Sequence, residues 1–161
     1  MQIRRTKAAD IKPSDTSALV PDLIQAPDIS WEWALNEIQS GLEEGRCSTK
    51  PNGGYVVNGM SPNTEWLQSI SKFLQNMDSN KIVRIQMYVA ITIHSHLFTQ
   101  HTDPGQRSII VQGQGRTAVV VGDQATVLEP GSIMYLNGDE PHRFTSLGPR
   151  FSITISLEET D

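Results

Sequence analysis

The sequence predicts a mainly β protein in which two helices precede a barrel or sandwich of short strands. From residue 82 onward, apolar and polar residues alternate with the period of two that β-strands require. Glycine and proline residues then divide the chain into short apolar stretches at close spacing, which is typical of barrels and sandwiches. Ahead of residue 82, apolar residues recur instead at helical spacing in two segments.

We expect residues 1–30 to form an extended arm. The stretch is polar, and one apolar anchor, Leu19-Val20 with Leu23-Ile24, would attach it to the core. Three prolines interrupt any helix here, namely Pro13, Pro21 and Pro27.

Two helices are expected between residues 30 and 77. The first covers 30–44 and ends at Gly45, with Trp31, Ala34, Leu35, Ile38 and Leu42 on one stripe. The second starts with Ser61 as N-cap and Pro62 at the first helical position, and it runs to about Met77. Residues 46–60, between the helices, are expected to form a loop with a short strand at 55–57.

The β core begins with a long strand over 82–93. With a segment around 95–100, about eight strands fit, as expected of a barrel. The others are expected at about 107–113, 115–121, 124–128, 132–136, 142–145 and 149–157. We therefore predict one domain over 1–161, made of an arm (1–30), a helical flank (31–77) and a β-barrel core (82–157).

The net charge, the cysteine count and the hydrophobic runs indicate which partners and which compartment to expect. A net charge of −5 disfavours nucleic acid as a partner without excluding a local basic groove. A single cysteine, Cys47, permits no internal disulfide and favours a reducing cytoplasm. The sequence shows no signal peptide and no transmembrane run, so we expect a cytoplasmic protein. We expect its substrate to be a small molecule or a peptide. The protein could form a homodimer.

His101, Asp103 and His142 are the candidate metal ligands and catalytic residues. His101 and Asp103 lie two residues apart, so in a strand both side chains point to one face. His142 follows 39 residues after Asp103, which is enough for hairpins that return the chain to the same place. Two histidines and one carboxylate leave coordination positions open and suit non-heme Fe(II). The alternative for the His-x-Asp pair alone is a hydrogen-bonded surface pair.

Arg150 and Ser152 are the candidate co-substrate ligands. In the last strand Arg150, Ser152, Thr154 and Ser156 alternate with apolar residues, so one face of the strand is polar. Inside a barrel that face makes a pocket for an anion, with Arg150 as a bidentate carboxylate ligand and Ser152 as a third donor. The alternative is a polar face that simply meets solvent.

At this point the chain resembles the Fe(II)/2-oxoglutarate-dependent dioxygenases. His101-Thr102-Asp103, His142 and Arg150-Phe151-Ser152 are similar to their His-x-Asp…His…Arg-x-Ser pattern, and residues 141–155 resemble the closing strands of the AlkB-like and prolyl-hydroxylase-like members. The resemblance implies a double-stranded β-helix, a cupin-like jelly-roll barrel, with the helices packed on one sheet. It also implies that His101, Asp103 and His142 bind iron and that Arg150 binds the distal carboxylate of 2-oxoglutarate. Oxygen takes the remaining site, and a hydroxylase of an unidentified substrate is expected.

A second resemblance is to the wider cupin group. Gly113-Gln114-Gly115, Pro130-Gly131 and Pro141-His142 are similar to the cupin pattern, but Gln100 stands where the His-x-His form, His94-Ser95-His96, needs a glutamate. A metal cupin of another reaction type and a non-catalytic metabolite-binding cupin therefore remain alternatives.

Several other polar residues have two interpretations each. His94 and His96 share strand parity with Tyr88, and they either line the pocket or lie on a solvated face. Tyr88 is a candidate hydrogen-bond partner for the co-substrate, or a core tyrosine. Asp123, Asp139 and Glu140 fall in turns, where solvated side chains are expected.

Overall fold

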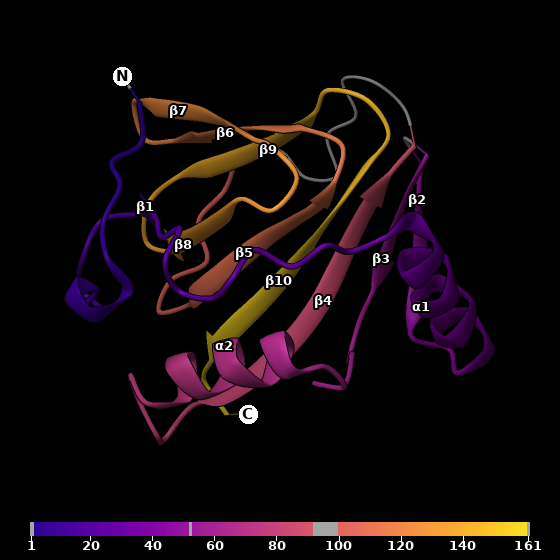
Figure 1. Ribbon diagram of the computed structural model, residues 1–161, viewed down its shortest axis with the longest axis horizontal. Helices are drawn as coiled ribbons and strands as arrows, with labels where there is room; N and C mark the ends of the chain where they lie inside the picture. Colours follow the sequence, from indigo (N-terminus) through magenta and orange to yellow (C-terminus); the bar gives the residue numbers. More distant parts are fainter. Residues whose placement is uncertain (1, 52, 92–99, 161) are drawn as a thin grey trace.

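The computed structural model describes residues 2–51, 53–91 and 100–160. Its β-strands form two antiparallel sheets. They face each other in Figure 1. The larger sheet has seven strands, in the order β1 (Ala18–Leu19), β8 (Ile133–Asn137), β5 (Arg107–Gln114), β10 (Arg150–Glu158), β4 (Ile82–Ala90), β3 (Gly54–Val57) and β2 (Cys47–Lys50). The smaller sheet has three strands, in the order β7 (Gln124–Leu128), β6 (Thr117–Val121) and β9 (His142–Ser146).

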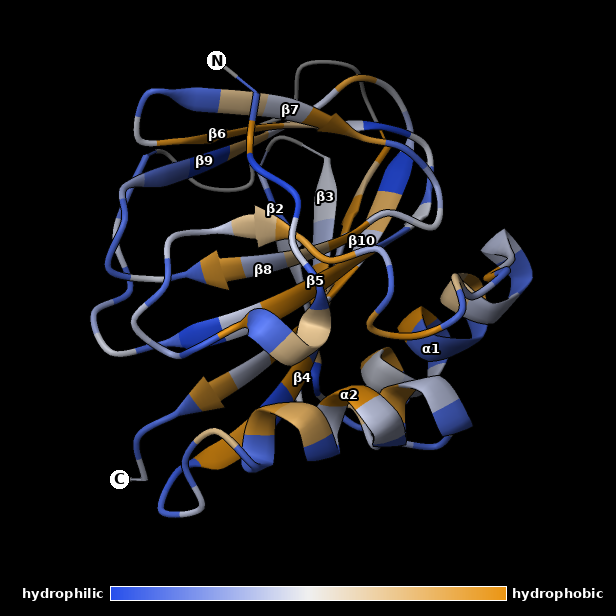
Figure 2. Cartoon of the chain, turned by 60° about the vertical axis from the view of Figure 1, so that its left-hand side comes forward, coloured by the Kyte–Doolittle hydropathy of each residue, from blue (hydrophilic) through white to orange (hydrophobic). Residues whose placement is uncertain are grey.

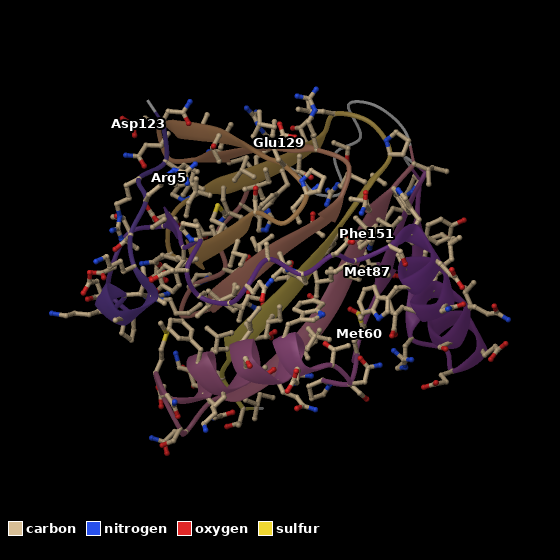
Figure 3. All side chains as sticks on the ribbon, in the orientation of Figure 1. Arg5, Met60, Met87, Asp123, Glu129 and Phe151 are labelled. Carbon is tan, nitrogen blue, oxygen red and sulfur yellow. The ribbon has the colours of Figure 1, made fainter. Side chains whose placement is uncertain are left out.

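Two helices, α1 (Trp31–Glu43) and α2 (Glu65–Gln75), cover the outer face of the seven-stranded sheet (Figure 1). Figure 3 marks Met87 and Phe151 on this side, and both are completely buried. They belong to a core cluster in which α2 residues pack on the strands: Leu67, Ile70 and Leu74 from the helix, and Ile85, Val89, Ile153 and Ile155 from β4 and β10. Figure 2 shows these strands as largely hydrophobic and most turns as hydrophilic.

The other face of the seven-stranded sheet looks toward the three-stranded sheet. Strand alternation turns the odd-numbered residues of β10 to the helices and the even-numbered ones, from Arg150 to Ser156, into the space between the sheets. Arg150, Ser152 and Ser156 are each no more than 3% exposed and Thr154 is half-buried, so most of the polar face of this strand is buried. A second apolar cluster fills the rest of the intersheet space, with Ile110, Val119, Leu128, Met134 and Leu136 among its members.

The N-terminal arm joins the edges of both sheets. Gln2 makes a parallel bridge to Ala125 of β7, while β1 pairs with β8 at the edge of the larger sheet. Ile3 and Val20 are both buried, in different core clusters. The predicted anchor around residues 19–24 is therefore only part of the attachment, because the arm also contributes a strand and a second buried contact.

The mainly β architecture with two preceding helices is confirmed, and the predicted strands from residue 107 onward lie within a few residues of β5 to β10. Two predictions of detail are wrong. The predicted loop 46–60 contains β2, which pairs antiparallel with β3, the next strand along the chain. Helix α2 begins at Glu65 with Thr64 as N-cap, because Thr64 Oγ1 accepts from Leu67 N, whereas Ser61 lies in a preceding turn.

The long strand predicted for 82–93 is observed as β4, which ends at Ala90. The remaining predicted strand, around 95–100, falls largely outside the described residues. Neither α1 nor α2 is long and apolar enough to cross a membrane.

Candidate functional site

All six candidate site residues line one cavity between the two sheets. His101, Asp103 and His142 lie on it together with Arg150, Ser152 and Tyr88. The remaining lining residues are Gln86, Gln106, Ser108, Ile110, Leu136, Phe144, Thr154 and Ser156. The cavity is thus mainly polar along β10 and β4, with a few apolar side chains.

Backbone pairing brings the two histidines together. His101 N donates to His142 O at 3.1 Å, and His142 N donates to His101 O at 2.9 Å. Residues that exchange both backbone bonds lie directly opposite each other, so their side chains share a face. The two imidazole centroids are accordingly 4.5 Å apart.

Asp103, two residues after His101, is the third member of the cluster. Its Oδ2 lies 3.4 Å from His101 Nε2 and 3.2 Å from His142 Nε2. Asp103 N donates to Gly138 O at 2.8 Å, which ties the carboxylate-bearing turn to the segment before β9. This approach is close, because a Cβ on Gly138 would lie 2.4 Å from Asp103 O.

The protonation of His142 follows from its second nitrogen. His142 Nδ1 lies 2.8 Å from Glu140 O, and a carbonyl only accepts, so Nδ1 carries the hydrogen. In the neutral ring, Nε2 then presents a lone pair toward Asp103 Oδ2. Lone pairs that converge on one point need a cation between them, either a proton or a metal ion.

The donor set fits a divalent transition metal. One ligand atom from each of His101, Asp103 and His142 lies within 4.8 Å of the others. Two ligands on one ion are at most about 4.4 Å apart, given bonds of about 2.0–2.2 Å, so small side-chain rotations suffice. His142 is 2% exposed, while the side chains of His101 and Asp103 are 36% and 38% exposed, so the cluster stays open on one side.

Arg150 is a buried cation in the same cavity. It is 2% exposed, its Nε donates to Ser146 Oγ at 2.9 Å, and its Nη1 donates to Ser152 Oγ at 3.0 Å. Among the residues that the structure describes, no carboxylate forms an ion pair with it. Burial lowers the pKa of Arg150 to about 10, so the side chain is still protonated at neutral pH. A protonated guanidinium without a counterion is a ready site for an anion.

A buried network holds this guanidinium in place. Ser152 Oγ donates to Gln112 Oε1 at 2.6 Å, and Thr117 Oγ1 donates to the same oxygen at 3.1 Å. The Ser152 hydroxyl thus accepts from Arg150 and directs its own hydrogen to Gln112, which makes it a support for Arg150. Gln112, which is fully buried, was missed in the sequence, because a glutamine inside an apolar strand carries no motif.

Tyr88 stands beside Ser152 in the adjacent strand. Its hydroxyl donates to Gln86 Oε1 at 2.8 Å. Burial is the main reason that the pKa of Tyr88 rises to about 12, with the negative charges of Asp103 and Glu158 contributing and Arg150 opposing. Tyr88 is therefore a neutral hydrogen-bonding group on the cavity wall at physiological pH.

The remaining candidates divide into two groups. His94 and His96 lie outside the described residues, so their predicted place on the wall stays a prediction. Asp123 and Asp139 are exposed, as expected, although Asp139 also accepts from Gly105 N and Arg107 Nη2; Glu140 is half-buried and accepts from Ser17. Such partners are distant in sequence, so no local signal could have identified them.

No protein-family model matches the sequence, and no curated protein matches it. Several solved structures, however, have a similar fold. The Escherichia coli ribosomal oxygenase YcfD, in complex with cobalt and 2-oxoglutarate, superposes with a TM-score of 0.52 at 18% identity, over 70% of this chain and 34% of that chain. KdgF from Halomonas sp. gives 0.53 at 14% identity, over 74% of this chain and 91% of that one.

A mutant of salicylate 1,2-dioxygenase from Pseudoaminobacter salicylatoxidans gives a TM-score of 0.52 at 14% identity, over 83% of this chain and 37% of that chain. This chain thus spans about a third of the length of both oxygenases. At such identities, the likeness shows that the chain shares the fold of these proteins.

Proposed function

We propose that the chain is an Fe(II)/2-oxoglutarate-dependent oxygenase, a hydroxylase built on a double-stranded β-helix. The proposal rests on two features of one cavity: a cluster of acceptor atoms that needs a cation, and a buried cation that needs an anion. His101, Asp103 and His142 converge their acceptor atoms at one place, and Arg150 is a buried cation with no carboxylate partner among the described residues. A metal ion chelated by a dicarboxylate would satisfy both.

In this proposal His101, Asp103 and His142 are the iron ligands. Glu140 O holds His142 in the tautomer whose Nε2 lone pair is directed at Asp103 and His101. Three protein ligands leave positions for 2-oxoglutarate and oxygen. When bound, iron would supply the chemistry that converts 2-oxoglutarate and oxygen to succinate and CO2 and oxidises the substrate.

Arg150 would bind the distal carboxylate of 2-oxoglutarate. Its Nη2 has no hydrogen-bond partner among the described residues, whereas Nε and Nη1 are held by Ser146 and Ser152. Two anchored nitrogens fix the plane of the guanidinium, so the free edge is oriented before the anion arrives. Pre-ordering of this kind reduces the entropy lost on binding.

The substrate would occupy the part of the cavity away from Arg150. The wall there carries uncharged hydroxyl and amide groups from Gln106, Ser108, Thr154 and Ser156. It continues toward a more open surface near Arg84 and Glu158. A small polar molecule or a peptide side chain suits this lining. YcfD supports the use of 2-oxoglutarate on this fold, but its ribosomal activity belongs to a chain of which the match covers only 34%.

The direct test is turnover of 2-oxoglutarate. With Fe(II), ascorbate and oxygen, we expect wild-type protein to form succinate slowly even without its substrate, above a blank that lacks enzyme. Asp103→Ala should stop the reaction, because it removes the one anionic ligand of the proposed set. If iron-loaded wild-type protein forms no succinate, alone or with candidate substrates, the oxygenase proposal fails and a cupin of another reaction type or a binding protein replaces it.

A further inference from the structure

The turn between β8 and β9 supports all three proposed ligands. Gly138 O accepts from Asp103 N at 2.8 Å, and the Asp139 carboxylate accepts from Gly105 N at 2.8 Å, within the turn that follows Asp103. Glu140 O lies 2.8 Å from His142 Nδ1, and His142 in turn pairs with His101 through the backbone. A displacement of this turn would therefore move every ligand.

The side chain of Glu140 attaches this turn to the N-terminal arm. Its Oε1 accepts from both Ser17 N and Ser17 Oγ, each at 2.7 Å. Ser17 is 2% exposed, and its Oγ also accepts from Asn137 N at 2.9 Å. One buried hydroxyl thus joins the start of the turn at Asn137 to its end at Glu140.

Neighbouring arm residues contact the same region. Asp15 O accepts from Asn137 Nδ2 at 2.9 Å. Pro13 O accepts from Arg107 Nε, and Arg107 Nη2 donates to Asp139 Oδ2 at 3.0 Å. The stretch 13–17 therefore lies against the turn between β8 and β9 and against the start of β5, although it is more than 80 residues away from them in the sequence.

We propose that Ser17 and Glu140 are positioning residues for the metal centre, and that arm residues 13–17 hold the turn between β8 and β9 in place. The inference rests on the proposed metal site. Glu140 is held at two points, since its carbonyl orients the His142 ring while its carboxylate is anchored to Ser17. Without the anchor, the peptide at Glu140 can rotate, and the ring loses the acceptor that fixes its tautomer and direction. Partners of this kind orient metal ligands and tune their affinity.

The expected effect is on metal affinity. Glu140→Ala removes the anchor but keeps the main-chain carbonyl, and we expect Co(II) to bind about tenfold more weakly, at the lower end of what loss of an outer partner costs. Ser17→Ala should do the same. The double variant should be no weaker than either single one, because both changes break one connection.

Glu140→Gln is the conservative variant. Its amide oxygen can accept both hydrogen bonds from Ser17, so Co(II) affinity and the Co(II) absorption spectrum should return close to wild type. Asp22→Ala is the matched control within the arm. Asp22 Oδ1 accepts from Ala8 N at 2.8 Å, within the arm itself, so this substitution should leave Co(II) binding unchanged.

The experiment measures Co(II) affinity by chelator competition, the Co(II) absorption spectrum, and the thermal midpoint of the metal-free protein. If Glu140→Ala does not fold, Glu140→Asp replaces it, because its carboxylate is one methylene shorter and does not reach Ser17. Equal Co(II) affinity and spectra in wild type, Ser17→Ala and the Glu140 variant would overturn the inference, even if their midpoints fall. Absence of Co(II) binding in wild type would instead refute the proposed metal site.

Discussion

The two ends of the cavity have opposite electrostatic requirements. At the start of β9, the buried His142 joins the partly exposed His101 and Asp103 in one group of acceptor atoms. At the end of β9, Ser146 accepts from Arg150, a buried donor without a counterion among the described residues. The backbone positions of His142 and Ser146 are about 13 Å apart along the strand, at about 3.3 Å per residue. One end thus needs a cation and the other needs an anion.

The two ends are also supported in different ways. Backbone bonds between paired segments and turns hold the metal ligands, as in the His101–His142 bridge. Side-chain bonds hold Arg150, through Ser146, Ser152 and Gln112. Because the supports do not overlap, a substitution in the supports of one end should leave the geometry of the other end intact.

The largest effect is expected at the metal end. His142→Ala should lower Mn(II) affinity by more than about 100-fold, because two protein ligands hold iron or manganese poorly and the lost ring is also the most buried of the three. His101→Ala should act similarly. Anaerobic calorimetry with Mn(II) measures the loss of affinity. Unchanged metal occupancy in both variants would show that the triad does not bind the metal.

Arg150→Ala should have the next largest effect, and on the anion alone. We expect 2-oxoglutarate affinity to fall by about 2–5 kcal/mol while Mn(II) affinity stays near wild type. Arg150→Lys should be intermediate, since the ammonium keeps the charge but loses the planar fork. Titration of 2-oxoglutarate into the Mn(II)-loaded proteins checks this. A wild-type affinity in Arg150→Ala would move the carboxylate site elsewhere.

Ser152→Ala should give a smaller loss at the same end. It removes the acceptor of Arg150 Nη1, so 2-oxoglutarate should bind about tenfold more weakly, a loss of about 1.4 kcal/mol, which is close to the lower end of the range for a hydrogen bond to a charged group. Ser156→Ala is the matched control on the same face of β10, where its hydroxyl pairs with Ser108 and not with Arg150. Equal losses of 2-oxoglutarate affinity in the two variants would mean that Ser152 has no specific role at Arg150.

The smallest effect should come from Thr64→Ala, which touches neither end. Loss of the N-cap bond to Leu67 N should cost about 1 kcal/mol of unfolding free energy. The thermal midpoint would then fall by about 2–4 °C. Mn(II) and 2-oxoglutarate affinities should not change, and a parallel fall in either would show that binding merely follows global stability.

Local pattern predicted much of this molecule, and the limits have physical causes. The alternation over β4 and β10 depends only on neighbouring residues, so the apolar and polar faces of both strands could be predicted. His101 and Asp103 share a face for the same reason. The supports of the site could not be predicted, because Gln112, Ser17 and Glu140 acquire their roles from partners that only the complete fold brings near.

The strand β2, which was predicted as a loop, has a more local explanation. The segment 47–50 has a polar, alternating pattern too short to mark a strand, and it becomes one because β3 offers an unpaired edge. The N-cap at Thr64 was misplaced for a more local reason, since Ser61-Pro62 is also a good start signal and tertiary packing decides between the two.

The central claim is that one ligand joins the two ends of the cavity, and a single titration series tests it. We predict that 2-oxoglutarate binds tightly to wild-type protein loaded with Mn(II), and much more weakly to metal-free wild type or to Mn(II)-loaded Arg150→Ala. Glutarate, which keeps both carboxylates but lacks the keto group needed for chelation, should bind weakly throughout. Equal 2-oxoglutarate affinity with and without Mn(II), or with and without Arg150, would contradict the account.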